Sequence, residues 1–300
     1  MKWNIITDSS CDMFGFDKEH ENIVFSSVPF TISVGDENFV DDRNLDVDGM
    51  IDSMDACAEA SHTACPSPHA WQEKFEQEGN VIAITISSKL SGSYNSACAA
   101  KDMVLEEQPD KKIAVIDSRS AGSELVLLVK KICELIESGA DFETVVEKAE
   151  LYSRHTHVVF ALSSFNNLVK NGRMSKIVGF VANKLGFWGI GIGSEQGTIE
   201  IKQKIRGSKK ALDAIIEDSL NEVAIVERGV SCLGSEGGSC VLRGVKSRAV
   251  AENDEHILEA AAACYQTDER HDEVGDERSD YLAERAADYN ADRHVNDIPL

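Results

Sequence analysis

Short apolar runs alternate with longer amphipathic segments through the first half of the chain. The runs have the length and β-branched content of buried strands, and they are WNIIT (3–7), VIAITI (81–86) and IAVID (113–117). Helical periodicity is expected in four segments, at residues 46–60, 68–78, 94–107 and 120–138. Strands separated by amphipathic helices predict an α/β fold with a mainly parallel sheet and helices on both faces.

A second α/β unit is predicted to begin near His155, after a boundary placed at Arg154. Its expected elements are a strand (157–162), a helix from Ser164, a turn (170–176), an apolar helix (177–188), a hairpin (193–204) and a helix after 206. The expected organisation is therefore a first domain at 1–154, a second domain at 155–265 and a tail at 266–300.

Charge and composition restrict the classes of function. With 42% apolar residues, 300 residues can bury two modest cores. A net charge of −22 argues against nucleic-acid binding, which needs a basic face. Residues 251–300 contain 15 acidic and four basic side chains, so half of the negative excess lies in the last sixth of the chain. We expect the stretch 266–300 to be a disordered acidic tail.

The sequence gives little sign of membrane insertion, disulfides or bound metal. No run of 18 apolar residues occurs, and the first apolar run is too short for a signal peptide, so a cytoplasmic protein is expected. The eight cysteines form no C-x-x-C pair and are interpreted as reduced thiols. Four histidines lack carboxylate partners at ligand spacing, so no metal site is predicted; they are His62, His69, His155 and His157.

Hydroxyl side chains follow two of the predicted strands. The first strand ends in TDSS (7–10), and the second runs into ISSKLSGSYNSA (86–97), which precedes a helix. Ligands of parallel sheets bind beyond the carboxyl ends of strands, and helix N-termini attract anions. Serines also favour turns and helix caps for purely local reasons, so this stretch alone leaves both interpretations open. The two prolines of TACPSP (63–68) predict a rigid loop that begins at Thr63.

Enzyme motifs fit the chain poorly. GIGIGSEQG (189–197) lacks the spacing of a dinucleotide fingerprint, and neither a phosphate-binding P-loop nor a G-x-S-x-G elbow is present. A serine hydrolase acting on a lipid or small ester stays open as an alternative. Its triad would have to combine Ser91, His62 and Asp117 by tertiary contact.

Six motifs in order give the chain a resemblance to the DegV family of bacterial fatty-acid-binding proteins. They are TDSS (7–10), TACPSP (63–68), ISSKLSGSYNSA (86–97), VIDSRSAGSE (115–124), KNGRMSK (170–176) and KIRGSKKA (204–211). The resemblance implies a two-domain α/β carrier without catalytic activity or cofactor. Such a carrier buries one long-chain fatty acid and presents the carboxyl group to a separate fatty acid kinase.

The resemblance also implies roles for particular residues. Thr63, Ser88 and Ser91 match the family's carboxyl-binding loops, while Arg173 and Arg206 match basic positions near the mouth of the site. Either arginine would balance the carboxylate, attract the acyl phosphate or dock the kinase, unless it simply satisfies a turn or helix end. The apolar stretch 175–188 contains Phe180, Phe187 and Trp188. It suggests a lid with transient membrane contact, and packing in the protein core is the alternative interpretation of the same pattern.

Beyond Glu222 the chain departs from the family pattern. The family's His-x-Gly-Pro-Gly loop, whose histidine closes the carboxyl site, is missing, and no Gly-Pro or Pro-Gly dipeptide occurs. VAIVE (223–227) could form the next strand, but loss of the last strands is expected to open the second sheet and expose its edge. A frameshift, a recombined end and a damaged family member that binds nothing remain alternatives.

Overall fold

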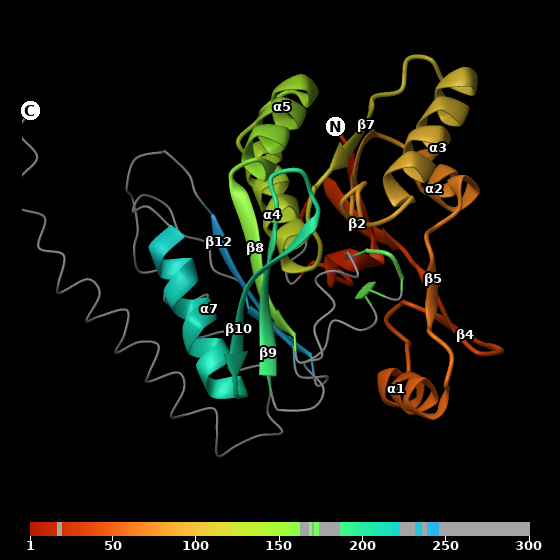
Figure 1. Cartoon of the computed structure of the whole chain (residues 1–300). Helices are drawn as coiled ribbons and strands as arrows, with labels where there is room; N and C mark the ends of the chain where they lie inside the picture. The colour runs from red at the N-terminus through yellow and green to blue at the C-terminus, as the bar shows by residue number, and fades with distance from the viewer. Residues whose placement is uncertain are drawn as a thin grey trace, which may run out of the picture.

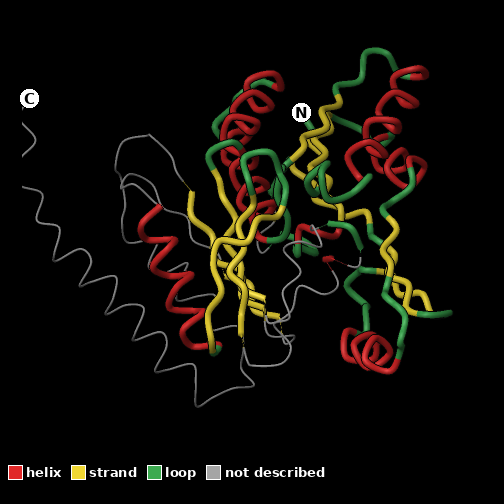
Figure 2. Tube along the Cα trace, viewed as in Figure 1, coloured by secondary structure: helices red, strands yellow, loops and turns green. Residues whose placement is uncertain are grey.

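The computed structural model describes residues 1–16, 20–162, 168–169, 171–173, 187–222, 232–235 and 239–245. Seen from left to right in Figure 1, helix α7, a second sheet, helices α4 and α5, a first sheet and helices α2 and α3 follow one another. Figure 2 shows the same layers with all helices in red and all strands in yellow. The protein is therefore an α/β protein with two main sheets, as the sequence predicts.

The first sheet is parallel throughout and has the strand order β2-β1-β6-β7. Its strands are β1 (Trp3–Asp8), β2 (Ile23–Val28), β6 (Asn80–Thr85) and β7 (Ile113–Asp117). Three of them coincide within a residue or two with the predicted strands. Every residue of β1 and β6 is buried, which explains their continuous apolar sequence.

Helices cover both faces of this sheet because side chains alternate along each strand. Ile6 faces one apolar cluster with α2 (Pro68–Phe75) and α3 (Ser93–Glu107). Ile5 faces the other cluster with α4 (Ser123–Glu137) and α5 (Phe142–Ser153). Helix α4 also contacts the second sheet, so it joins the two sheets.

A small antiparallel sheet with the order β4-β3-β5 was not predicted from the sequence. It consists of β3 (Thr31–Val34), β4 (Glu37–Val40) and β5 (His62–Ala64), and helix α1 (Val47–Ala56) lies in the connection between β4 and β5. Thr63, which was expected in a loop, pairs with Ile32 inside this sheet. The short strands carry few apolar residues, so periodicity gave no signal for them.

The second sheet is antiparallel and has the order β10-β9-β8-β12-β11. Its strands are β8 (Thr156–Leu162), β9 (Phe187–Gly193), β10 (Ile199–Arg206), β11 (Cys232–Ser235) and β12 (Ser239–Val245). Helix α7 (Ser208–Glu222) packs on it through Ala211 and Ile215, against Val159, Ala161 and Ile190. The predicted hairpin and final helix are thereby confirmed.

Two expectations for this sheet are wrong. Phe187 and Trp188 begin strand β9 and do not end an apolar helix, because alternating residues of β9 face the sheet's core. The sheet does not end with the residues before Glu222, because two later strands extend it: β12 pairs with β8, and β11 pairs with β12. The expected lid (its residues 175–186), the expected strand at 223–227 and the expected tail at 266–300 lie outside the described residues.

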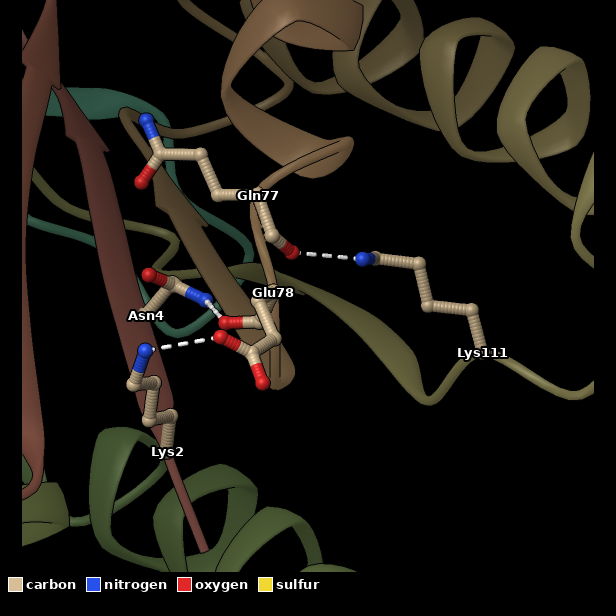
Figure 3. A network of polar contacts seen from close by, with 5 residues as sticks. All are labelled: Lys2, Asn4, Gln77, Glu78 and Lys111. Carbon is tan, nitrogen blue, oxygen red and sulfur yellow. Dashed lines mark hydrogen bonds and ion pairs between the residues drawn. The ribbon is translucent and has the colours of Figure 1, made fainter.

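Polar contacts fasten the amino-terminal edge of the first sheet (Figure 3). Lys2 Nζ lies 2.7 Å from Glu78 Oε2, and Asn4 donates from Nδ2 to the Glu78 carbonyl at 2.9 Å. Lys111 donates from Nζ to the Gln77 carbonyl at 2.5 Å. These contacts hold the segment between α2 and β6 against the start of β1 and the segment before β7. Within the described ranges, no helix has the length and apolar character needed to cross a membrane.

Candidate functional site

The loops that follow β1, β6 and β7 meet at one edge of the parallel sheet. Backbone hydrogen bonds tie them together: Ser87 N donates to the Ser120 carbonyl at 2.8 Å, and Gly122 N donates to the Ser10 carbonyl at 2.7 Å. Parallel strands all end at the same edge, which is where ligands of such sheets bind. The structure therefore brings the TDSS loop, the Ser-rich loop and the loop after Asp117 together.

Asp8, a buried carboxylate, organises the first of these loops. Its Oδ1 accepts from Ser10 Oγ at 2.5 Å, and its Oδ2 accepts from Ser93 Oγ at 2.6 Å and from Ile86 N at 3.0 Å. Burial raises the pKa of Asp8, and the hydrogen bonds from Ser10, Ser93 and Ile86 oppose that rise. Asp8 thus joins the end of β1 to the end of β6 and to the first turn of α3.

Ser88 is bonded to Asp117 through both its backbone and its side chain. The Ser88 amide donates to Asp117 Oδ1 at 3.0 Å, and the Ser88 hydroxyl donates to Oδ2 at 2.5 Å. The Arg119 amide also donates to Oδ1, at 3.0 Å. Because a hydroxyl has one hydrogen, Ser88 Oγ is left only with acceptor capacity toward a ligand.

Ser91 has the complementary arrangement. Its backbone amide donates to the Ser87 carbonyl at 3.1 Å, and its Oγ accepts from Ser93 N at 3.3 Å. The hydroxyl hydrogen of Ser91 is therefore not used in these bonds and can be donated to an anion. Ser91 is half-buried and lies two residues before Ser93, the first residue of α3.

Arg173 connects the two loops that sequence analysis assigned to a carboxyl group. Its Nη2 donates to Thr63 Oγ1 at 2.8 Å, and its Nε donates to the Leu90 carbonyl at 3.0 Å. Thr63 is exposed and Arg173 is half-buried. Since Thr63 Oγ1 accepts from the guanidinium, this bond leaves the hydrogen of the threonine hydroxyl unused, and none of the hydrogen bonds within the described ranges takes it up. Residues 110 positions apart in the chain thus share one site.

Arg206 lies apart from this cluster in the hydrogen-bond network. It is the exposed last residue of β10, and no hydrogen bond joins it to Thr63, Ser88, Ser91 or Arg173 in the described part of the chain. Sequence analysis did not identify Asp8 or Ser87 as site residues, and it considered Asp117 only as a member of a hydrolase triad. The two aspartates end β1 and β7 at the carboxyl edge of the sheet, and that position was the available signal.

The alternative chemistries find little support in this geometry. No hydrogen bond links Ser91 to His62, or His62 to Asp117, all three of which are described; Asp117 is taken up by Ser88 and Arg119. Among the described residues, no group of three or more His, Cys, Asp or Glu side chains is arranged to hold a metal ion.

Comparisons with known proteins agree with one another. A family model described as "Uncharacterised protein, DegV family" matches residues 2–268. A DegV domain-containing protein of Streptococcus pneumoniae is 49% identical over 218 residues, covering 73% of this chain and 78% of the relative.

Two solved structures are similar over most of the chain. The Streptococcus pneumoniae Fatty Acid Kinase (Fak) B3 protein loaded with linoleic acid has 39% identity and a TM-score of 0.77; the likeness covers 82% of this chain and 100% of that chain. A DegV family protein from Eubacterium eligens loaded with heptadecanoic acid has 31% identity and a TM-score of 0.75, with the same coverage.

Proposed function

We propose that this chain, which belongs to the DegV family, binds one long-chain fatty acid and presents its carboxyl group at the edge of the parallel sheet. The fatty acid is the bound ligand, and no cofactor is part of the proposal. The protein acts as a carrier without catalytic activity. The fatty-acid-loaded structures of the pneumococcal and Eubacterium eligens proteins support this proposal.

The single observation that carries the proposal is the bridge from Arg173 to Thr63 and to the Leu90 carbonyl. Arg173 bonds the Thr63 hydroxyl oxygen and the carbonyl of Leu90, the residue before Ser91. Among the described residues, the hydroxyl hydrogens of Thr63 and Ser91 are not used in the bonds given above, so both support donation to a ligand. Such a set suits a carboxylate, because charge-assisted hydrogen bonds offset the cost of removing it from water. Ser88 holds the loop through Asp117 and does not donate to the ligand itself.

The energy of binding comes mainly from the acyl chain. Burying about 16 carbons at roughly 0.8 kcal/mol per methylene contributes on the order of 10 kcal/mol before the costs of association. The head-group contacts therefore serve orientation more than affinity. They fix the carboxyl group at one end of the site, where a second protein can reach it.

A separate fatty acid kinase is the proposed partner, consistent with the name of the pneumococcal protein. The kinase would supply ATP and phosphoryl transfer, and this chain would supply the oriented carboxyl group. Arg206, exposed at the end of β10, is the proposed docking residue. Because no hydrogen bond links Arg206 to Thr63 or Arg173 among the described residues, we expect it to contact a partner without changing the carboxyl site.

The proposal is tested by comparing the binding of oleic acid with that of its methyl ester. We expect the free acid to bind at least about 10-fold more tightly, because the ester carries no charge for the donors to stabilise. Thr63→Val and Ser91→Ala should each remove most of that preference, while the exposed control Ser138→Ala keeps it. Equal binding of acid and ester by the wild-type protein would overturn the head-group assignment.

The same ester distinguishes a carrier from a serine hydrolase. A carrier leaves methyl oleate intact over hours, whereas a hydrolase releases oleic acid and loses that activity with Ser91→Ala.

A second experiment tests the partner. Arg206→Glu should slow acyl phosphate formation by a fatty acid kinase without changing oleic acid affinity. Loss of affinity in Arg206→Glu would contradict the assignment of Arg206 to docking.

A further inference from the structure

The turn between β9 and β10 has one buried residue, Gly197, among exposed neighbours. Glu195, Gln196 and Thr198 are exposed on either side of it. The turn is closed by its own hydrogen bonds, from Gly197 N to the Ser194 carbonyl at 2.9 Å and from Ser194 N to the Thr198 carbonyl at 2.8 Å. A closed turn that buries only its glycine is docked against another part of the molecule.

Gly197 docks on the loop after β6. The Ser87 hydroxyl donates to the Gly197 carbonyl at 2.7 Å, and this bond is buried. A Cβ atom on residue 197 would lie 2.3 Å from Ser87 Oγ and 3.1 Å from Arg119 Cα. The φ angle of Gly197 is +84°, a region that side chains disfavour. Both the backbone and the space therefore require glycine at this position.

Ser87 in turn fixes the loop that contains the proposed head-group donor. Its carbonyl accepts from Leu90 N at 3.0 Å and from Ser91 N at 3.1 Å, and its Oγ accepts from Lys89 N at 3.2 Å. Ser87 has no exposed surface, so its own atoms in these bonds are shielded from water, while Lys89 is exposed. The loop is held a second time at Leu90, where the carbonyl accepts from Arg173.

We propose that Ser87 and Gly197 form a clasp, by which the β9–β10 turn positions residues 88–91, and that this clasp controls how long a bound fatty acid is retained. Ser87 and Gly197 are positioning residues, since they act on the head group through Ser91 and the neighbouring amides. The effect on retention rests on the proposed fatty-acid binding. The effect on the loop does not, because it follows from contacts within the chain.

The clasp is tested with Ser87→Ala, Gly197→Ala and the double variant. Gly207→Ala is the matched control, because Gly207 also has a positive φ, +91°, but no atom lies within 4 Å of an added Cβ. One readout is hydrogen exchange at the amides of residues 89–91. The other is the rate at which bound cis-parinaric acid leaves the protein for phosphatidylcholine vesicles.

We expect Gly197→Ala to accelerate both exchange and dissociation by about 10-fold or more. Ser87→Ala should accelerate them by about three- to tenfold, because it loses its hydrogen bond to the turn and also the bond that Ser87 Oγ accepts from Lys89 N. Exchange in Ser87→Ala is therefore compared at residues 90 and 91, whose acceptor is the Ser87 carbonyl. Gly207→Ala should change both rates by less than about twofold. In the Ser87→Ala background the added effect of Gly197→Ala should shrink, since the hydroxyl oxygen nearest to the new Cβ is gone.

Four results would overturn the proposal in whole or in part. The first is unchanged exchange at residues 89–91 in Gly197→Ala while the amides of β6 stay protected. The second is an equal factor for Gly197→Ala with and without the Ser87 hydroxyl. If Gly197→Ala does not fold, unchanged exchange at residues 90 and 91 in folded Ser87→Ala is decisive against the clasp. A wild-type protein that holds no parinaric acid overturns the retention claim together with the proposed function, and the exchange data still decide the clasp.

Discussion

Replacing Arg173 by lysine separates the geometry of the head-group site from its charge. Arginine bonds Thr63 Oγ1 and the Leu90 carbonyl at once, from Nη2 at 2.8 Å and from Nε at 3.0 Å. Lysine keeps the positive charge but has a single nitrogen and no planar fork, so it cannot reproduce both bonds in the same geometry. Arg173→Gln removes both the charge and the fork.

The structure sets the size of the expected effects. A hydrogen bond that involves a charged group contributes about 1.5–3 kcal/mol, and each 1.4 kcal/mol is about a tenfold change in affinity. Because Arg173 is only half-buried, we take the lower end of that range for each bond. Oleic acid affinity should fall about 10-fold in Arg173→Lys and about 100-fold in Arg173→Gln.

The assay is displacement of cis-parinaric acid fluorescence by oleic acid, with the melting temperature of the unliganded protein measured alongside. Arg154→Gln, which removes an exposed arginine at the end of α5, serves as the control for net charge and should keep the wild-type affinity. Wild-type affinity in Arg173→Lys would refute the role of the double bond. Wild-type affinity in Arg173→Gln as well would remove Arg173 from the site altogether.

Three further predictions concern stability and reactivity. Because the pKa of folded Asp8 is raised, its stabilising contribution is present below the unfolded pKa near 3.8 and is lost as the pH rises through the folded pKa. Asp8→Asn should therefore flatten the fall in the free energy of unfolding, measured by urea titration at a series of pH values. An unchanged pH profile would contradict the burial of the charge. Gly79→Ala should lower the free energy of unfolding by at least about 2 kcal/mol in urea titrations, because φ is +110° and the new Cβ would lie 2.5 Å from the Lys2 carbonyl oxygen. The control Gly139→Ala, with open space around it, should lower it by about 1 kcal/mol. Equal losses in the two variants would refute the clash. Burial raises the pKa of the Cys133 thiol to about 12. In the native protein at pH 8, iodoacetamide should therefore label half-buried Cys65 at least about 100-fold faster than Cys133, as followed by peptide mass spectrometry.

The sequence predicts those elements whose residues repeat with a clear period. The buried strands β1, β6 and β7 and the long helices α3 and α4 were expected at nearly their observed positions. Strand β2 was missed because IVFSSV mixes two serines into an edge strand. The small sheet β4-β3-β5 was missed because its strands are short and mostly exposed, so neither alternation nor apolar content distinguishes them.

The candidate site could be predicted only in part. Thr63, Ser91 and Arg173 came from the family resemblance, and nothing in their spacing shows that the arginine would bond the threonine 110 residues away. The partnership of Ser88 with Asp117 depends on the register of β6 against β7, which a single sequence does not fix. The docking of Gly197 on Ser87 depends on how the β9–β10 turn meets the first sheet, a contact between distant segments without a local pattern.

The central claim is that a fatty acid is bound through its carboxyl group at Thr63 and Ser91, and denaturing extraction of the purified protein followed by mass spectrometry tests it most directly. We predict near-stoichiometric long-chain fatty acid from the wild-type protein and a strong loss from the Thr63→Val/Ser91→Ala double variant. Equal lipid yields from the two proteins, or no fatty acid from a folded wild-type protein supplied with oleic acid, would contradict the account.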